Sequence, residues 1–150
     1  MEVNIRTLKA EDLQELVELY SHLNPDDPAT DADTMSLVWE QTEASGTVEY
    51  IGLYIRTKLV SSCQKVVVPN LTRSGQPYCL LENVVTLTDY RNRGYGKQLL
   101  KHTIEQAWSE GCYKVMLMSG RKEDSIVQFY RRAGFSENEK RAFIVRRDSA

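Results

Sequence analysis

The stretch Asp89-Tyr90-Arg91-Asn92-Arg93-Gly94-Tyr95-Gly96-Lys97 decides the fold of this chain of 150 residues. It places basic residues and two glycines between an apolar run, which predicts a strand, and an amphipathic run, which predicts a helix. The first N–H groups of a helix have no partner within the helix and carry partial positive charge, and glycine lets an anion approach them. The turn is therefore a candidate phosphate site. The alternative is an ordinary basic helix start after a tight turn.

The turn differs from two better-known phosphate loops. No Ser or Thr follows a Gly-Lys pair, which excludes the nucleoside-triphosphate loop, and the three glycines of the dinucleotide-binding turn are absent. The turn therefore matches neither of these two phosphate loops.

The segments around the turn predict a strand-turn-helix-strand unit. After the turn, one apolar stripe runs along a helix that Gly111 can end; its residues are Leu99, Leu100, Ile104, Ala107 and Trp108. Before the turn, β-branched and aromatic runs predict strands at about residues 48–56, 59–68 and 78–87, and alternation predicts another at 113–117. The strands on either side of the helix are expected to pair in parallel.

The two ends of the chain complete the predicted order. Residues 3–5 alternate as a short strand, and helical spacing predicts helices at about residues 11–23 and 33–44. A further helix is expected from Ile126 to Ala133, followed by closing strands from Phe135 onward and at 142–146. The predicted class is mixed α/β, in the order β-α-α-β-β-β-α-β-α-β-β, in a single domain over residues 1–150.

The amino-acid composition excludes several classes of protein function. The net charge of -2 and the pI near 5.7 provide no global attraction to nucleic acid or to an anionic membrane. Cys63, Cys79 and Cys112 are widely spaced and lie in apolar stretches, so we expect buried thiols, and neither a disulfide framework nor a metal site. There is no signal-peptide pattern and no apolar run long enough to span a bilayer. A soluble cytoplasmic protein is predicted.

Two motifs together resemble one known family. The turn contains R-x-x-G-x-G, and residues 129–135 read Phe-Tyr-Arg-Arg-Ala-Gly-Phe, which is similar to F-Y-x-x-x-G-F. Both are typical of the GNAT superfamily of N-acetyltransferases. The resemblance implies a twisted, mostly antiparallel sheet of about six to seven strands flanked by about four helices. It also implies acyltransferase activity with acetyl-CoA as co-substrate and without a metal.

The resemblance also implies roles for individual residues. The pyrophosphate would be held, mainly by main-chain N–H groups, at Arg91, Asn92, Arg93, Gly94, Tyr95, Gly96 and Lys97. The main chain of Val85 and Leu87 would bind the pantetheine arm as an added strand. Tyr130 would protonate the departing thiolate, since a phenol keeps its proton at neutral pH. The alternative for Tyr130 is an aromatic residue of the core.

Glu82 is the candidate general base. It is a carboxylate within an otherwise apolar strand, and an amine must lose a proton before it attacks a carbonyl. The alternatives for Glu82 are a solvent-facing strand position and an ion pair with an arginine.

The acceptor stays open at the level of sequence. A primary amine of a small molecule is the leading hypothesis. The strings 82–85, Glu-Asn-Val-Val, and 112–115, Cys-Tyr-Lys-Val, are similar to the glucosamine-phosphate N-acetyltransferase branch, although that branch often has Asp where Asn83 stands. A non-catalytic acyl-CoA sensor is the rival class. A homodimer and a longer acyl donor are further open alternatives.

Overall fold

The computed structural model describes residues 2–148. The chain divides into a first compact unit that ends at Leu117 and a second that begins at Met118, and the two are described separately. The prediction of a single domain stays a prediction.

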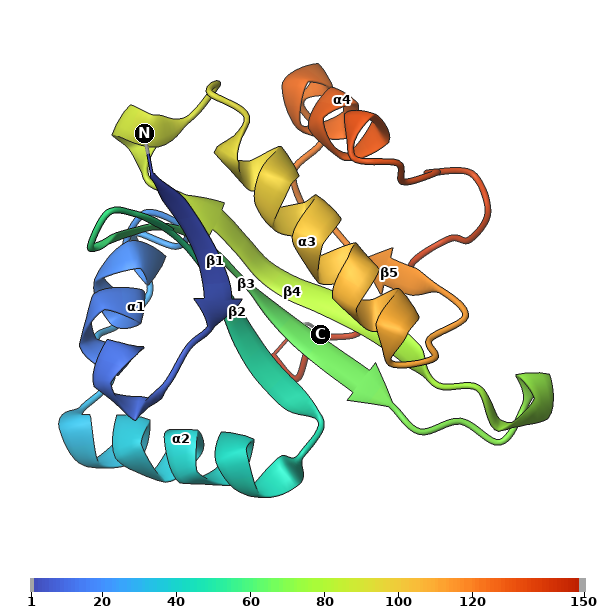
Figure 1. Cartoon of the computed structure of the whole chain (residues 1–150), viewed down its shortest axis with the longest axis horizontal. Coiled ribbons are helices and arrows are strands. Elements are labelled where there is room, and N and C mark those ends of the chain that lie inside the picture. The colour runs from blue at the N-terminus through green and yellow to red at the C-terminus, as the bar shows by residue number, and fades with distance from the viewer. Residues whose placement is uncertain (1, 149–150) are drawn as a thin grey trace. The chain divides into compact units, whose positions relative to one another are not determined.

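The first unit is built on one mixed sheet (Figure 1). Its strands lie in sequence order, and the pairs β1/β2, β2/β3 and β3/β4 are antiparallel, whereas β4 and β5 are parallel. The parallel crossover through the helix after the turn is therefore confirmed. The strands are β1 (Val3–Thr7), β2 (Val48–Ile55), β3 (Lys58–Val68), β4 (Tyr78–Thr86) and β5 (Val115–Leu117).

Four α-helices confirm the predicted helices. The first unit contains α1 (Leu13–Tyr20), α2 (Ala32–Ser45) and α3 (Tyr95–Ser109), and the second contains α4 (Asp124–Arg132). Short 3-10 turns occupy Ala10–Asp12, Arg73–Gly75 and Thr88–Tyr90. Local chemistry fixes the ends of α2, because Asp31 accepts a hydrogen bond from the N–H of Thr34 at 2.8 Å and Gly46 leaves the helix at φ 66°.

Helices cover both faces of the sheet. The α1/α2 face, which denotes the face that these two helices cover, packs Leu16 and Leu19 of α1 and Trp39 of α2 against the strands. The opposite face packs Tyr95 and Leu99 of α3 against another buried cluster. In Figure 1, α3 lies across β3 and β4. The sheet is therefore a wall between two cores, and its strands are apolar on both sides.

One irregularity in β4 changes the direction of its side chains. Ser62 pairs with Val85 and Gln64 pairs with Glu82, so two residues of β4, Asn83 and Val84, stand opposite Cys63 alone. This is a β-bulge, and Asn83 adopts φ 51°, which asparagine tolerates better than most residues. Beyond the bulge, the alternation along β4 is shifted by one residue.

The strand count is lower than predicted. The sheet has five strands rather than six to seven, and the expected closing strands from Phe135 onward and at 142–146 are absent from residues 118–148. The predicted strand at 142–146 was wrong because a strand requires a paired neighbour, and none is formed there. Its apolar residues Phe143, Ile144 and Val145 are 77 to 93% exposed.

A charged network ties the start of α1 to the sheet. Arg6 donates two hydrogen bonds to the Asp12 carboxylate, at 2.8 and 2.9 Å, and Tyr54 Oη donates a third at 2.9 Å. The N–H of Lys9 adds a fourth at 2.8 Å. The guanidinium of Arg6 is the largest cause that holds the pKa of Asp12 well below its ordinary value. The Asp12 carboxylate therefore stays charged in the folded protein, and these four hydrogen bonds compensate for its burial.

Candidate functional site

The turn before α3 exposes the positive end of the helix dipole. Asn92 and Gly94 adopt left-handed conformations, at φ 61° and 84°, and α3 begins at Tyr95. The first turn of α3 contains no acidic residue, and no side chain caps it. A Cβ atom at Gly94 would meet nothing within 4 Å, so glycine is needed there for its backbone conformation. The first main-chain N–H groups of α3 thus remain available to an anion.

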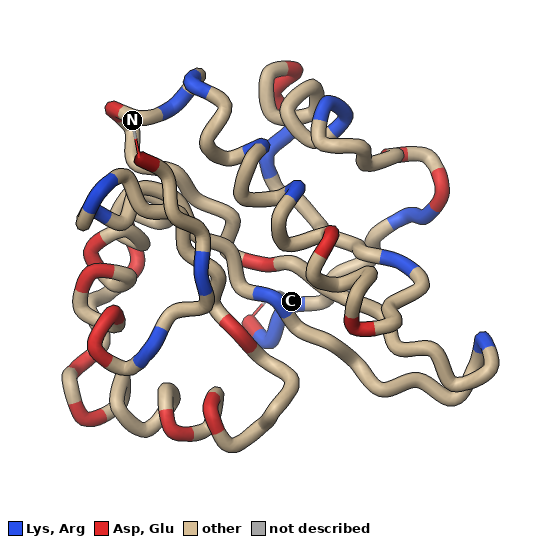
Figure 2. Tube along the Cα trace, viewed as in Figure 1, with Lys and Arg blue, Asp and Glu red and all other residues tan. Residues whose placement is uncertain are grey.

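The basic residues of the turn have different surroundings. Arg91 Nε donates to the carbonyl of Thr86 at 3.0 Å, so Arg91 fixes the turn to the end of β4. The Arg93 guanidinium lies 5.5 Å from the ring centre of Tyr90, and Lys97 is exposed. Figure 2 shows basic residues in the turn and in the first half of α3. Arg93 and Lys97 can move toward a ligand at small cost because they are not held by ion pairs within the described residues.

The bulge decides which main-chain groups of β4 face the open edge. The N–H of Leu87 donates to the carbonyl of Val60 at 2.8 Å, and Val85 pairs with Ser62, so both residues direct their main chain toward β3. Main-chain groups alternate along a strand, so those of Val84 and Thr86 point the other way. Within residues 2–148, β5 pairs with β4 only as far as Leu81. The open edge therefore belongs to Val84 and Thr86, whereas Val85 and Leu87, which were predicted to bind the pantetheine arm, face β3.

Glu82 lies on the α1/α2 face in a row of polar side chains. Tyr50 of β2 pairs with Gln64 of β3, and Gln64 pairs with Glu82, so all three lie on the same face of the sheet. Asn83 Nδ2 donates to Gln64 Oε1 at 3.3 Å, and Gln64 Nε2 donates to Tyr50 Oη at 3.2 Å. Glu82 itself is exposed and forms no ion pair among the residues described. The alternative of an arginine partner is thus not seen.

Tyr130 belongs to an aromatic group within the second unit. Its ring lies 5.0 Å from that of Phe129 and 6.0 Å from that of Phe135, both edge to face. The N–H of Phe135 donates to the carbonyl of Tyr130 at 3.1 Å, and Gly134 ends the helix at φ 102°. The F-Y-x-x-x-G-F spacing therefore folds into one compact turn, and the role of Tyr130 as an acid stays a prediction.

The cysteines are unsuited to nucleophilic catalysis. All three are buried and free, and burial raises the pKa of Cys63 to about 11 and that of Cys79 to about 12. Burial also raises the pKa of Cys112. A thiol must ionise to attack a carbonyl, so these side chains stay protonated and inert at neutral pH. Within residues 2–148, no group of three His, Cys, Asp or Glu side chains is placed to hold a metal ion.

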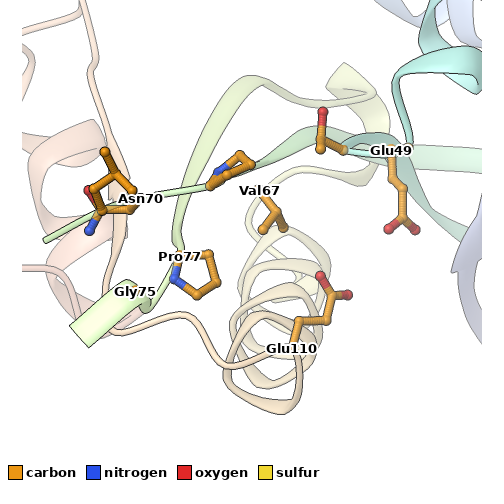
Figure 3. Close-up of a pocket in the computed structure, with 10 residues that line it drawn as sticks. Glu49, Val67, Asn70, Gly75, Pro77 and Glu110 are labelled. Atoms are coloured by element: carbon orange, nitrogen blue, oxygen red, sulfur yellow. The ribbon is translucent and has the colours of Figure 1, made fainter. Parts of the chain in front are cut away.

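One cavity lies at the other end of α3 from the turn. It measures about 590 Å³ and is lined by Glu49, Val67, Asn70, Gly75, Pro77 and Glu110, among others (Figure 3). Behind it, the fully buried Lys65 pairs with the carboxylates of Glu49 and Glu110. A smaller cavity of about 330 Å³ borders the turn itself, between the end of α1 and residues 87–90. Of the two, only the smaller adjoins the candidate phosphate site.

Three features together describe the class of fold found in acyltransferases. They are the mixed sheet, the bulge in its fourth strand and the uncapped helix that follows a glycine-containing turn. Residues 7–135 match the family described as "Acetyltransferase (GNAT) family". The chain belongs to this family and is an acyltransferase, as the resemblance predicted. None of the helices in the described part of the chain is long and apolar enough to cross a membrane.

Individual relatives cover almost the whole chain. A glucosamine 6-phosphate N-acetyltransferase of Trypanosoma brucei brucei is 30% identical, with 93% of each chain covered. A putative acetyltransferase from Agrobacterium tumefaciens is 38% identical with a TM-score of 0.90, covering 95% of this chain and 99% of that one. The solved complex of AAC(6')-Iy with the bisubstrate analogue CoA-S-monomethyl-acetylneamine is 20% identical at a TM-score of 0.79. It covers 98% of this chain and 99% of that one and shares the fold.

Sequence reasoning missed the shift of the open edge to Val84 and Thr86 and the side chains that gather around Glu82. The sequence contained one signal of the shifted open edge. Asparagine after a charged residue inside an apolar strand is a composition that suits a bulge, because Asn enters the left-handed region readily. The sequence contained no signal of the side chains around Glu82, because they come from segments that are distant along the chain.

Proposed function

We propose that this protein transfers an acetyl group from acetyl-CoA directly to a primary amine of a small molecule. The observation that carries the proposal is the uncapped amino end of α3, which offers main-chain N–H groups behind a turn with two left-handed residues. A pyrophosphate matches this arrangement because its charge is stabilised by the helix dipole without a buried cation.

The donor is held along β4 and at the turn. Main-chain groups of residues 91–97 bind the pyrophosphate, with Arg93 and Lys97 adding charge. The pantetheine arm pairs with the open edge of β4 at Val84 and Thr86, as an added strand would. The thioester then reaches the bulge, beside Glu82.

The reaction needs two proton transfers. Glu82 accepts a proton from the ammonium group of the acceptor, directly or through water, which frees the nitrogen lone pair. The nitrogen attacks the thioester carbonyl, and the C–S bond breaks as the amide forms. Tyr130 protonates the departing thiolate of coenzyme A. The cysteines take no part, because their thiols stay protonated.

Glucosamine 6-phosphate is the specific acceptor favoured by one observation. The relative from Trypanosoma brucei brucei that carries this activity in its name covers 93% of the chain at 30% identity. A sensor that binds acyl-CoA without turnover is the competing class, since it would keep the same turn.

Two measurements test the proposal. Acetyl-CoA should raise the melting temperature, because a ligand at about a hundred times its Kd stabilises a folded protein by roughly 2.7 kcal/mol. Release of free thiol should then be followed with glucosamine 6-phosphate, polyamines, aminoglycosides and amino acids. A thermal shift without turnover on any amine supports the sensor, and no shift at millimolar acetyl-CoA rejects the proposal.

A further inference from the structure

We propose that the Arg91 side chain positions the acceptor side of the site and is not a ligand of the pyrophosphate. Its guanidinium fixes His22, near the start of the loop between α1 and α2, to the end of β4. The inference rests on the proposed acetyl transfer and assigns a positioning residue to the same site.

The guanidinium of Arg91 joins two parts of the chain that are distant in sequence. Nε donates to the carbonyl of Thr86 at 3.0 Å, and Nη2 donates to the carbonyl of His22 at 3.5 Å. Arginine presents its donors in one rigid plane, so a single guanidinium can hold two carbonyls at fixed positions. Arg93, in the same turn, lies over the ring of Tyr90 and donates to no carbonyl among the described hydrogen bonds. Arg91 is therefore less free than Arg93 to turn toward a phosphate.

A second contact connects His22 to the same turn. Nδ1 of His22 and Oγ1 of Thr88 lie 3.3 Å apart. Thr88 begins the 3-10 turn Thr88–Tyr90, and the N–H of Arg91 donates to the carbonyl of Thr88 at 3.3 Å. Both ends of this short turn thus hold one residue, His22, by its ring and by its main chain. His22 and Thr88 also form part of the wall of the cavity of about 330 Å³ beside the turn.

These two contacts, called the His22 contacts below, connect the proposed donor side to the proposed acceptor side. The main chain of Thr86 belongs to the open edge of β4, where the pantetheine arm is proposed to pair. His22 follows α1, and α1 covers the face of the sheet on which Glu82 lies. A misplacement of about 1 Å, even from a change far from the chemistry, can cost about a hundredfold in rate. Arg91 can therefore affect the acceptor without touching either reactant.

The two arginines of the turn form a matched pair of variants. Arg91→Gln and Arg93→Gln remove the same charge from the same turn. Isothermal titration gives the Kd for acetyl-CoA, and thiol release gives the acceptor KM for the best of the amines named above. Arg91→Gln should raise the acceptor KM by about tenfold and leave the Kd within about twofold, because the His22 contacts are weakened. Arg93→Gln should raise the Kd by about fivefold, since a charge beside the phosphate is lost, and leave the acceptor KM within about twofold.

Arg91→Lys separates geometry from charge. Lysine keeps the charge but carries its donors on one nitrogen atom, so it cannot reproduce the separate contacts of Nε and Nη2. Arg91→Lys should therefore raise the acceptor KM about as much as Arg91→Gln. Thr88→Val removes the other contact without a change of charge and should raise the acceptor KM by about two- to threefold. A wild-type KM in Arg91→Lys, or a Kd in Arg91→Gln as weak as that of Arg93→Gln, would overturn the inference and make Arg91 an anion ligand.

Hydrogen exchange tests the His22 contacts without turnover. The N–H groups of His22, Leu23 and Asn24 donate to carbonyls of α1, at 3.0, 3.0 and 3.1 Å. Their exchange should become about tenfold faster in Arg91→Lys and stay unchanged in Arg93→Gln, while both variants melt within about 5 °C of the wild-type protein. Unchanged exchange in Arg91→Lys would contradict the inference. Failure of the wild-type protein to acetylate any amine would instead contradict the proposed function, and the exchange rates would still decide whether Arg91 positions His22.

Discussion

The two sides of β4 are built from different parts of the chain. On the proposed donor side, the turn and the open strand edge come from one continuous segment, residues 84–97, and the groups they offer to a ligand are mainly main-chain groups. On the proposed acceptor side, Tyr50, Gln64 and Glu82 come from three separate strands, and the groups they offer to a ligand are side chains. The difference teaches that a donor common to a family can be held by backbone, whereas an acceptor is chosen by side chains that vary independently.

Removing the proposed base should affect the acceptor side alone. We expect Glu82→Gln to lower kcat by about a hundredfold or more, the scale of general base catalysis, with an unchanged thermal shift by acetyl-CoA. Glu105→Gln, on α3, is the control for loss of one surface charge. If Glu82→Gln lost affinity for acetyl-CoA by a factor comparable to its loss of kcat, the donor side and the acceptor side of the site would not be separable.

The two faces of the sheet can be compared through the charged side chain that is buried on each. On the face that α3 covers, this side chain is Lys65. Lys65 is fully buried, whereas its partners Glu49 and Glu110 are 37% and 34% exposed at the side chain. The double variant Glu49→Gln with Glu110→Gln leaves an uncompensated buried ammonium and should cost about 3–5 kcal/mol in urea unfolding. Lys65→Met leaves solvated carboxylates and should stay within about 1 kcal/mol. Equal losses in the two would contradict this asymmetry.

On the α1/α2 face, Asp12→Asn should destabilise the fold by about 2 kcal/mol at pH 7, because charged hydrogen bonds to Arg6 are lost. The folded pKa of Asp12 is depressed, so its contribution is complete above the unfolded pKa near 3.9 and is lost as pH falls toward the folded pKa. The gap between the two proteins should therefore shrink below about pH 4. Urea unfolding at pH 7 and pH 3 measures it, and a constant gap would exclude this linkage.

The smallest effect is expected for the backbone of the donor side. Gly94→Ala and Gly46→Ala both place a Cβ in a left-handed conformation with open space around it, so each should cost about 1 kcal/mol of stability. Only Gly94→Ala should also raise the Kd for acetyl-CoA, by roughly tenfold, since crowding the phosphate removes about 1.4 kcal/mol of binding energy. Isothermal titration with both variants provides the comparison; matched affinities would place the pyrophosphate elsewhere.

Local sequence patterns predicted the helix ends and turns that depend on residues near one another in the chain. Gly46 and Gly111 end helices as expected, and the turn at residues 91–97 opens α3 as its glycines required. The sequence failed where the outcome depends on pairing. Residues 142–146 have strand composition without a partner strand, and the choice between Val85 and Val84 depends on a bulge that the register with β3 reveals.

The sequence by itself determined the family, the helices, the parallel crossover and the turn that offers main-chain N–H groups to an anion. These follow from short-range periodicity and from residues within one continuous motif. The tertiary structure alone decided that Val84 and Thr86 face the open edge of β4 and that Gln64 and Asn83 lie beside Glu82. The physical reason is that register and face depend on hydrogen bonds between strands distant in sequence, and one bulge reverses every later side chain.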